Sequence, residues 1–425
     1  MKIKLINHAS VIFDCGSVKI LTDPWYTGSI FNNGWDLLVE TNNDINDLDF
    51  NYLWYSHEHP DHFSVADLKK ISEEKRKNIT VLFQKTPDQK VKHFCEKLDI
   101  KVKELEPNIE YDIDGVRVSC APVGGFDSWL KVEHDNTTVL NINDCRVETI
   151  EEVTELKSSI GKIDVLMTQF SPANWCGNEG DTSITQVTRE KVFVKNDNQI
   201  KILKPKFVIP FASFSWFSHE ENSFCNQSYI TLQEFDQRYK KENVVVLYID
   251  DEWEVGNEHD SNSAMTKWDK VLCKTTAPKR FSDKKDIEDL QASFAKMINK
   301  IKNINDWEAI KQLKNDGLLE PCVIYLKDTN KTLLYDITQE KLLDSNKNPD
   351  IIMGSESFKY MMDFMWGRGT LTINGRFETR YNTFYKFLRQ THIYYANNIG
   401  LRYPDTISRQ DILKPKSFVY DLVNM

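Results

Sequence analysis

The sequence contains no run of about 18 uninterrupted apolar residues, the length that a membrane-spanning helix requires. Its first residues also lack the basic and then apolar pattern of a secretory signal peptide. Positive charge is in the minority, because 54 lysines and arginines stand against 64 aspartates and glutamates, for a formal net charge of -10. We therefore expect a cytoplasmic protein without a membrane span. The acidic balance argues against a broad nucleic-acid-binding surface.

Paired cysteines are also missing. None of the eight cysteines forms a C-x-x-C or C-x-H pair, the spacings typical of zinc ribbons and Rieske clusters, so we expect neither site. Scattered cysteines are instead typical of reduced thiols in a cytoplasmic protein. They stand at positions 15, 95, 120, 145, 176, 225, 273 and 322.

What is present is enough apolar residues for more than one packed core. The 425 residues are 40% hydrophobic and 12% aromatic. We place a first domain at residues 1–255 and a second at residues 264–425, because the polar, glycine-containing stretch between them is typical of a linker.

The segment most indicative of function has the sequence Ser-His-Glu-His-Pro-Asp-His and follows a short apolar run. In an extended segment alternate side chains share a face, so His57 and His59 point the same way and can share one metal ion. Pro60 favours a turn, which re-aims Asp61 and His62 toward a second metal ion nearby. A lone histidine is more often a structural residue, but the combined pattern favours a metal site.

This pattern resembles the hallmark of the metallo-β-lactamase superfamily. The resemblance implies an α/β protein, an αββα sandwich with a C-terminal α+β domain, and divalent metal ions bound at the sheet ends. Further motifs narrow it: Asn-His-Ala-Ser, Thr-Asp-Pro-Trp, Leu-Asn-Ile-Asn-Asp-Cys, Gln-Phe-Ser-Pro-Ala and Pro-Phe-Ala-Ser-Phe. Over about residues 1–250 they resemble the branch that contains L-ascorbate-6-phosphate lactonase and the metallo-β-lactamase-like part of CMP-N-acetylneuraminate hydroxylase.

The resemblance assigns roles to three further residues. Asp23 follows a hairpin predicted at residues 2–13 and 18–22, and it corresponds to an aspartate that orients the metal ligands through hydrogen bonds. Taken alone, it could equally be a turn-forming residue. Asp144 corresponds to the carboxylate that bridges the two metal ions. His219 is the natural candidate for the last ligand.

A third histidine for the first metal ion, which superfamily members commonly supply, is missing from the expected strand end. Asp127 is the nearest substitute and His134 is the alternative, and we favour Asp127. With a carboxylate at this position, the sequence does not determine which metal is bound. We expect two divalent ions, zinc first, with iron or manganese as alternatives.

The C-terminal residues suggest a second, α+β domain with a helix, hairpin, strand, helix and strand. This order resembles a sterol-carrier-protein-like domain. A final aromatic-rich helix at residues 381–398 is expected to dock onto the first domain or a second subunit, which would give a homo-oligomer. The other elements are predicted at residues 284–302, 322–326 with 332–337, 350–353, 355–365 and 369–375.

Two enzymatic hypotheses and one non-catalytic hypothesis use these residues. In a hydrolase, the metal ions lower the pKa of a bound water from about 15.7 to about 7, so that hydroxide attacks a phosphoester, lactone or sugar-nucleotide-type small molecule. Asp61 would also steer the nucleophile, and the polar segment 26–51 would cover part of the substrate. A dinuclear-iron, O2-dependent oxygenase would need an external electron donor. The third hypothesis is a metal-binding protein without catalysis. We expect the hydrolase.

Overall fold

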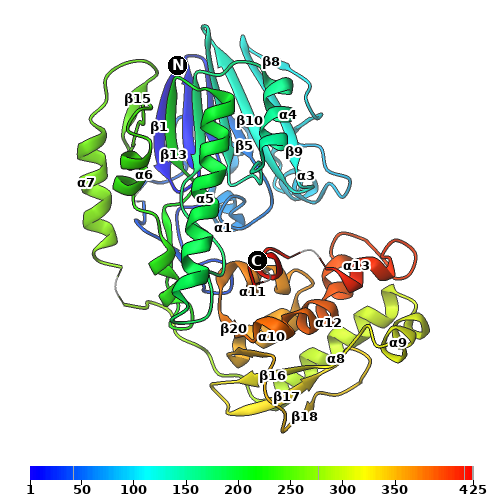
Figure 1. The fold of residues 1–425 in the computed structure, drawn as a ribbon. Coiled ribbons are helices and arrows are strands. Elements are labelled where there is room, and N and C mark those ends of the chain that lie inside the picture. Colours follow the sequence, from blue (N-terminus) through cyan, green and yellow to red (C-terminus); the bar gives the residue numbers. More distant parts are fainter. Residues whose placement is uncertain (42, 276, 416, 424–425) are drawn as a thin grey trace.

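The computed structural model describes residues 1–423 except 42, 276 and 416, and residue 42 belongs to the predicted covering segment 26–51. Figure 1 shows two bodies, one above the other. The N-terminal body extends to the end of α7 (Ser261–Leu272), and the C-terminal body begins at α8 (Ile287–Ile304). None of the described helices is long and apolar enough to cross a membrane.

Two sheets lie face to face in the N-terminal body, with helices on their outer sides (Figure 1). The first has the order β15-β1-β2-β3-β5-β6-β7 and the second the order β13-β12-β11-β10-β9-β8. This arrangement confirms the expected αββα sandwich. The first sheet consists of β1 (Lys2–Asn7), β2 (Ser10–Cys15), β3 (Val18–Thr22), β5 (Tyr52–Tyr55), β6 (Thr80–Gln84), β7 (Lys101–Leu105) and β15 (Glu252–Glu254). The second consists of β8 (Tyr111–Ile113), β9 (Val116–Val123), β10 (Asp127–His134), β11 (Thr137–Asn143), β12 (Val165–Gln169) and β13 (Phe207–Phe211).

The strands of the first sheet are apolar on both faces, because each face covers a different core. In β3, Ile20 points into the core between the sheets, whereas Leu21 points into the core beneath the outer helices. Trp54 and Leu53 of β5 divide in the same way, as the alternation of side chains along a strand requires. The helices are α1 (Val65–Lys70), α2 (Glu73–Asn78), α3 (Lys90–Glu96), α4 (Ile150–Ile160), α5 (Thr182–Leu203), α6 (Leu232–Arg238) and α7 (Ser261–Leu272).

The strand predicted at residues 2–13 is divided in two. The chain turns back at His8 and Ala9, so that β1 and β2 pair antiparallel, and His8 takes a left-handed φ of 20°. Because apolar residues lie on both sides of the turn, the sequence alone indicates one long strand. His8 consequently lies at the tip of a hairpin rather than inside a strand.

The boundary between the two bodies lies later in the chain than predicted. Ala264, Met265 and Trp268 of α7 pack into the core between the sheets, and the Trp268 ring stacks on Phe214 at 4.2 Å. The polar stretch at 256–263 therefore connects β15 to α7 and is not an interdomain linker. Its polarity reflects an exposed turn on the N-terminal body.

The C-terminal body has a sheet in the order β18-β17-β16-β19-β20, packed against α8, α10 and α12. Leu290, Phe294 and Met297 of α8 are buried in its core, as the helical spacing predicts. The predicted docking helix α12 places Phe384 and Phe387 in this same core. The elements are α8 (Ile287–Ile304), α9 (Trp307–Asn315), β16 (Cys322–Leu326), β17 (Lys331–Tyr335), β18 (Leu343–Asp344), β19 (Ile351–Met353), α10 (Ser355–Asp363), α11 (Gly367–Asn374), β20 (Phe377–Thr379), α12 (Phe384–Asn397), α13 (Arg409–Leu413) and α14 (Phe418–Val423).

The strand predicted at residues 369–375 is helix α11. Threonine and isoleucine residues give this stretch a local preference for extended structure, but packing between α10 and α12 overrides that preference. Gly375 ends the helix with a left-handed φ of 68°. The last strand of the sheet is instead β20.

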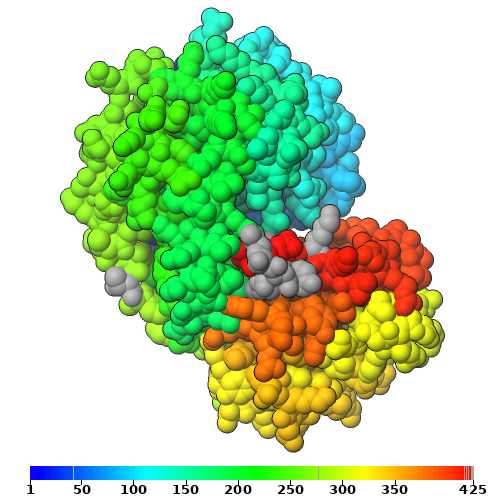
Figure 2. Space-filling view, in the orientation of Figure 1, coloured from blue at the N-terminus to red at the C-terminus, as the bar shows by residue number. Residues whose placement is uncertain are grey.

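The two bodies share an extensive interface. Figure 2 shows the C-terminal body packed directly beneath the N-terminal body. The Trp175 indole N–H donates to the carbonyl of Phe377 at 3.2 Å, and its ring stacks on the Phe377 ring. Asn178 and Thr379 exchange two hydrogen bonds of 2.9 Å. These buried contacts fix the position of α11 and β20 against the N-terminal body.

Candidate metal centre

The Ser-His-Glu-His-Pro-Asp-His segment leaves the end of β5, in the middle of the first sheet. His57 Nε2 and His59 Nδ1 lie 2.8 Å apart, so these two imidazoles face one point. The backbone N–H groups of His62 and Phe63 both donate to the carbonyl of His59. This turn carries Asp61 and His62 back toward the same point.

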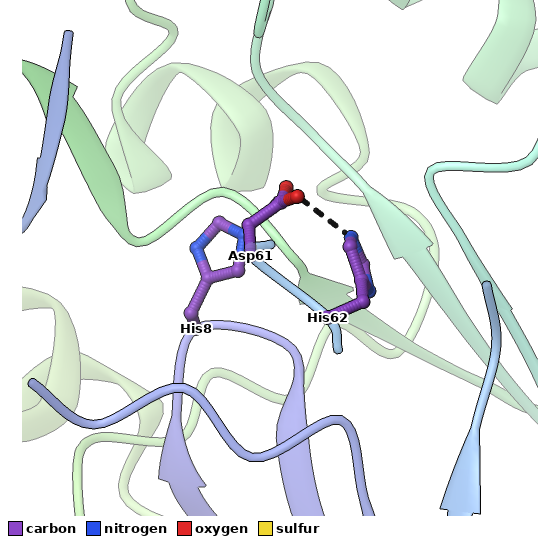
Figure 3. Close-up of side chains that lie close together, drawn as sticks. All are labelled: His8, Asp61 and His62. Atoms are coloured by element: carbon purple, nitrogen blue, oxygen red, sulfur yellow. Dashed lines mark ion pairs between the residues drawn. The ribbon is translucent and has the colours of Figure 1, made fainter. Parts of the chain in front are cut away.

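Three overlapping groups of side chains offer metal-ligating atoms. Within each group these atoms lie within 4.8 Å of one another. Figure 3 shows one group, in which His8 and His62 flank Asp61. Asp61 belongs to two of the groups, which suits a site for two neighbouring ions. The groups are His57, His59 and Asp61; His57, His62 and Asp144; and His8, Asp61 and His62.

Several buried polar atoms in this cluster have no hydrogen-bond partner, although such atoms are almost always paired in folded proteins. Among the described residues, no lysine or arginine is ion-paired with Asp61 or Asp144. Imidazole nitrogens and carboxylate oxygens are ligands for zinc, iron and manganese. The residues therefore fit divalent metal ions. The atoms without a hydrogen-bond partner are His8 Nδ1, Asp61 Oδ1, His62 Nε2 and Asp144 Oδ1.

The carboxylates control the charge of His62. Although burial opposes its protonation, Asp144, Asp61 and Asp23 raise the pKa of His62 well above its usual value. Burial alone would raise the pKa of Asp61, but His62 and His8 lower it well below the usual range. Without metal, a proton on His62 thus offsets part of the buried negative charge that a cation would otherwise balance.

At the other two histidines burial outweighs the nearby carboxylates. It lowers the pKa of both His57 and His59, so each imidazole is neutral at neutral pH. A neutral imidazole is the form that binds metal. These two side chains are therefore ready to bind without first losing a proton.

Asp127 and His134 lie at opposite ends of β10, and the structure brings only Asp127 to the cluster. Its Oδ1 lies 3.8 Å from His57 Nε2. Burial and the nearby Asp144 raise the pKa of Asp127 to about 7. His134 pairs with Asp135 at the far end of the strand.

His219 does not join the cluster. Its Nδ1 lies 3.8 Å from Glu221 and its Nε2 lies 4.0 Å from Glu356 of the C-terminal body. The preceding strand β14 (Ser215–Phe217) pairs with β4 (Trp35–Leu37) instead of extending β13, and this carries His219 toward the domain interface. The structure thus does not support His219 as the last ligand. The sequence analysis missed His8, whose signal was the polar Asn-His-Ala-Ser between two strand-length apolar stretches.

Asp23 supports the cluster from behind. It is fully buried and accepts hydrogen bonds from the backbone N–H of Ser56 at 2.8 Å, the Ser56 hydroxyl at 2.8 Å and the Asn143 amide at 2.9 Å. A fourth bond, of 2.9 Å, joins it to Nδ1 of His62. This bond keeps the proton of His62 on Nδ1 and leaves Nε2 toward the metal ligands.

Backbone strain accompanies this arrangement. His8, Asp23 and Asn143 have left-handed φ angles of 20°, 35° and 55°. Residues other than glycine rarely adopt such angles, and they do so mostly where surrounding contacts hold a functional side chain in place. All three bring a side chain to the cluster or to its immediate support.

We predict that Asp23→Asn weakens metal binding by about 10- to 100-fold. The amide cannot accept all four hydrogen bonds, so His62 loses its fixed orientation. Competition with a chromophoric chelator measures the affinity. Asp36→Asn is a matched control, because Asp36 is also buried but pairs with Arg280 away from the cluster. Equal losses in the two variants would contradict the orienting role.

The cluster opens into a cavity of about 800 Å³. His57, Glu58 and His59 line this cavity. Tyr360 and Trp366 of the C-terminal body also line it. Pockets for small-molecule ligands typically have volumes of about 300–1,000 Å³, so this cavity can hold a substrate.

Comparisons with known proteins show which proteins the N-terminal body resembles. Residues 2–212 match the model of the beta-lactamase superfamily domain. A Mycolicibacterium smegmatis protein named as a Rieske 2Fe-2S iron-sulfur protein is 30% identical over 187 residues, which is 41% of this chain. The cytidine monophosphate-N-acetylneuraminic acid hydroxylase of Xenopus laevis is 24% identical over 253 residues, 54% of this chain. The chain spans only 35% and 40% of the lengths of these two relatives.

A comparison with solved structures also found similar chains. CmlA, a diiron beta-hydroxylase from Streptomyces venezuelae, superimposes with a TM-score of 0.43 at 14% identity. The superposition covers 60% of this chain and 54% of the other.

Proposed function

Because the chain belongs to the metallo-β-lactamase superfamily through residues 2–212, we propose that it is a metal-dependent hydrolase of a small molecule with a phosphoester or lactone bond. The observation that carries this proposal is the convergence of His57, His59, Asp61 and His62 with the distant Asp144 beside a ligand-sized cavity.

The cluster divides into ligands for two ions. Asp144 Oδ2 lies 3.8 Å from His57 Nε2 and 3.6 Å from His62 Nε2, so its carboxylate can serve both ions. Asp61 can likewise contribute to both ion sites, because it belongs to the group with His57 and His59 and to the group with His8 and His62. His57, His59 and Asp127 would hold one ion, and His8 and His62 the other.

When bound, the metal ions would lower the pKa of a water to about 7 and polarise the substrate oxygen. The protein supplies the remaining requirements. The free Oδ1 of Asp61 can accept a hydrogen bond from the attacking water and orient it. Asp23 and Ser56 keep the imidazole rings of His57 and His62 in position. The cavity, which His57 and His59 line, would hold the substrate beside the metal ligands.

A second candidate is an O2-dependent oxygenase with a dinuclear iron site and an external electron donor. Asp127 at the place of a third imidazole favours it, because carboxylate-rich sites suit iron as well as zinc. The similarity to the Xenopus laevis hydroxylase over the N-terminal body gives it further support.

Loading the metal-free protein separately with zinc, manganese and iron tests the two candidates. We expect the zinc or manganese form to cleave aryl phosphoesters or lactones without O2. Asp144→Asn protein, treated identically, controls for activity from free metal. Turnover confined to the iron form, with O2 uptake and a required reductant, would replace the hydrolase by the oxygenase. Bound metal with neither activity would leave the non-catalytic hypothesis.

A further inference from the structure

The wall of the cavity comes from both bodies. Phe31, Phe63 and Phe94 contribute from the N-terminal body, and Trp366, Tyr395 and Ile399 from the C-terminal body. Figure 2 shows that the C-terminal body packs directly against the body that carries the metal centre. The site is therefore incomplete without α10, α11 and the end of α12.

Exposed apolar side chains concentrate at this cavity. Of the eleven large hydrophobic residues that are exposed in the described chain, four line it: Val65, Phe126, Trp366 and Ile399. Trp366 is 46% exposed and Ile399 is 45% exposed. A cluster of this kind, contributed by two bodies around one cavity, is typical of a ligand-binding surface rather than of scattered surface residues.

The wall carries little charge. Among the described residues that line it, Glu58 and Lys90 are the only ones with a charged side chain, since His57 and His59 are neutral at neutral pH. Lys90 Nζ is already engaged, because it lies 3.0 Å from Asp88 and donates to the carbonyl of Asn398 at 3.1 Å. Recognition of phosphate groups generally uses arginine and lysine side chains. The wall thus suits an uncharged ligand body rather than a sugar nucleotide.

The C-terminal body also holds a loop of the N-terminal body that lines the cavity. Phe31, Asn32 and Asn33 have consecutive left-handed φ angles of 50°, 56° and 58°. The Asn374 amide donates to the carbonyl of Phe31 at 2.9 Å, and Arg376 donates to the carbonyl of Asn32. These bonds hold this wall in an unusual backbone conformation.

We propose that the C-terminal body completes the substrate site, and that the substrate has a bulky, uncharged and apolar body. This inference rests on the proposed function for one point, that the reacting group lies at the His57 and His59 end. The apolar body then extends between the aromatic walls toward Trp366 and Ile399. Burial of its surface, rather than ion pairing, supplies most of the binding free energy.

Fluorescence titration with N-phenyl-1-naphthylamine, an uncharged apolar probe, tests this inference on the full-length chain. We expect saturable binding, both in metal-loaded and in chelator-treated protein. Ile399→Asp places a charge in the wall and should weaken binding by at least about tenfold. Leu343→Asp is the matched control, because Leu343 is also 45% exposed, lies in the C-terminal body and is not part of the wall. Trp366→Ala should weaken binding without adding charge.

A second titration connects the cavity to the metal centre. In metal-loaded protein, decanohydroxamate should displace the probe at about 100-fold lower concentration than acetohydroxamate, because its chain buries additional methylene groups. Any one of three results would overturn the inference: the probe does not bind saturably, the Ile399 and Leu343 variants lose equal affinity, or the two hydroxamates displace the probe with equal potency. If this binding pattern holds while all hydrolysis assays fail, the proposed reaction is wrong and the apolar site stands.

Discussion

Asp144→Asn is expected to remove most of the bound metal and nearly all turnover. Asp144 Oδ2 lies 3.8 Å from His57 Nε2 and 3.6 Å from His62 Nε2, and Asp144 Oδ1 is buried without a hydrogen-bond partner. An amide keeps the shape of the side chain but loses its negative charge. Removal of an orienting residue typically lowers metal affinity by about 10- to 100-fold, and the loss here should be larger. Elemental analysis after dialysis measures the metal content.

His219→Gln is the control for this prediction. Its nitrogens contact Glu221 and Glu356 at the domain interface, so the variant should keep its full metal content. His8→Gln should lose metal, because His8 belongs to one of the ligand groups. Metal loss in the His219 variant but not in the His8 variant would restore the ligand set expected from the sequence. Full metal content in Asp144→Asn would contradict the shared carboxylate.

Arg376→Met is expected to lower the free energy of unfolding by about 3–5 kcal/mol. The Arg376 side chain is fully buried, and it donates to Glu221 at 2.8 Å and to Glu356 at 2.6 Å. Its removal leaves these two carboxylates at the interface without their main partner, and it releases the carbonyl of Asn32. Urea denaturation, monitored by tryptophan fluorescence, measures the change.

Two further variants separate a buried charge effect from a general effect of losing an arginine. Arg409→Met removes an exposed arginine that pairs with Asp316 and should cost at most about 1 kcal/mol. Adding Glu221→Gln and Glu356→Gln to Arg376→Met should recover part of the lost stability, because no unpaired charge then remains buried. Equal costs for the Arg376 and Arg409 variants would show that the interface network is not a stabilising feature.

The sequence predicted best what depends on neighbouring residues. The loop that follows β5 and the turn at Pro60 suffice to bring His57, His59, Asp61 and His62 together, because all four lie within six positions. Apolar spacing likewise predicted α8 and the hairpin of β16 and β17.

The features that the sequence did not predict depend on packing between distant segments. His8 reaches the cluster only because β1 and β2 form a hairpin, and His219 leaves it because β14 pairs with β4. The extended preference of the stretch at 369–375 gave way to helix packing between α10 and α12. The cavity as a whole was not predictable, since its walls come from segments more than 300 positions apart, although part of the predicted covering segment 26–51 lines it.

The division of the cavity wall separates two tasks along the chain. The residues that would perform the chemistry precede position 145, whereas Trp366, Tyr395 and Ile399 follow position 360. Selection can thus retune which molecules the protein accepts by changing α11 and α12, while the reacting machinery stays intact. Directed evolution toward new compounds has its natural starting positions there.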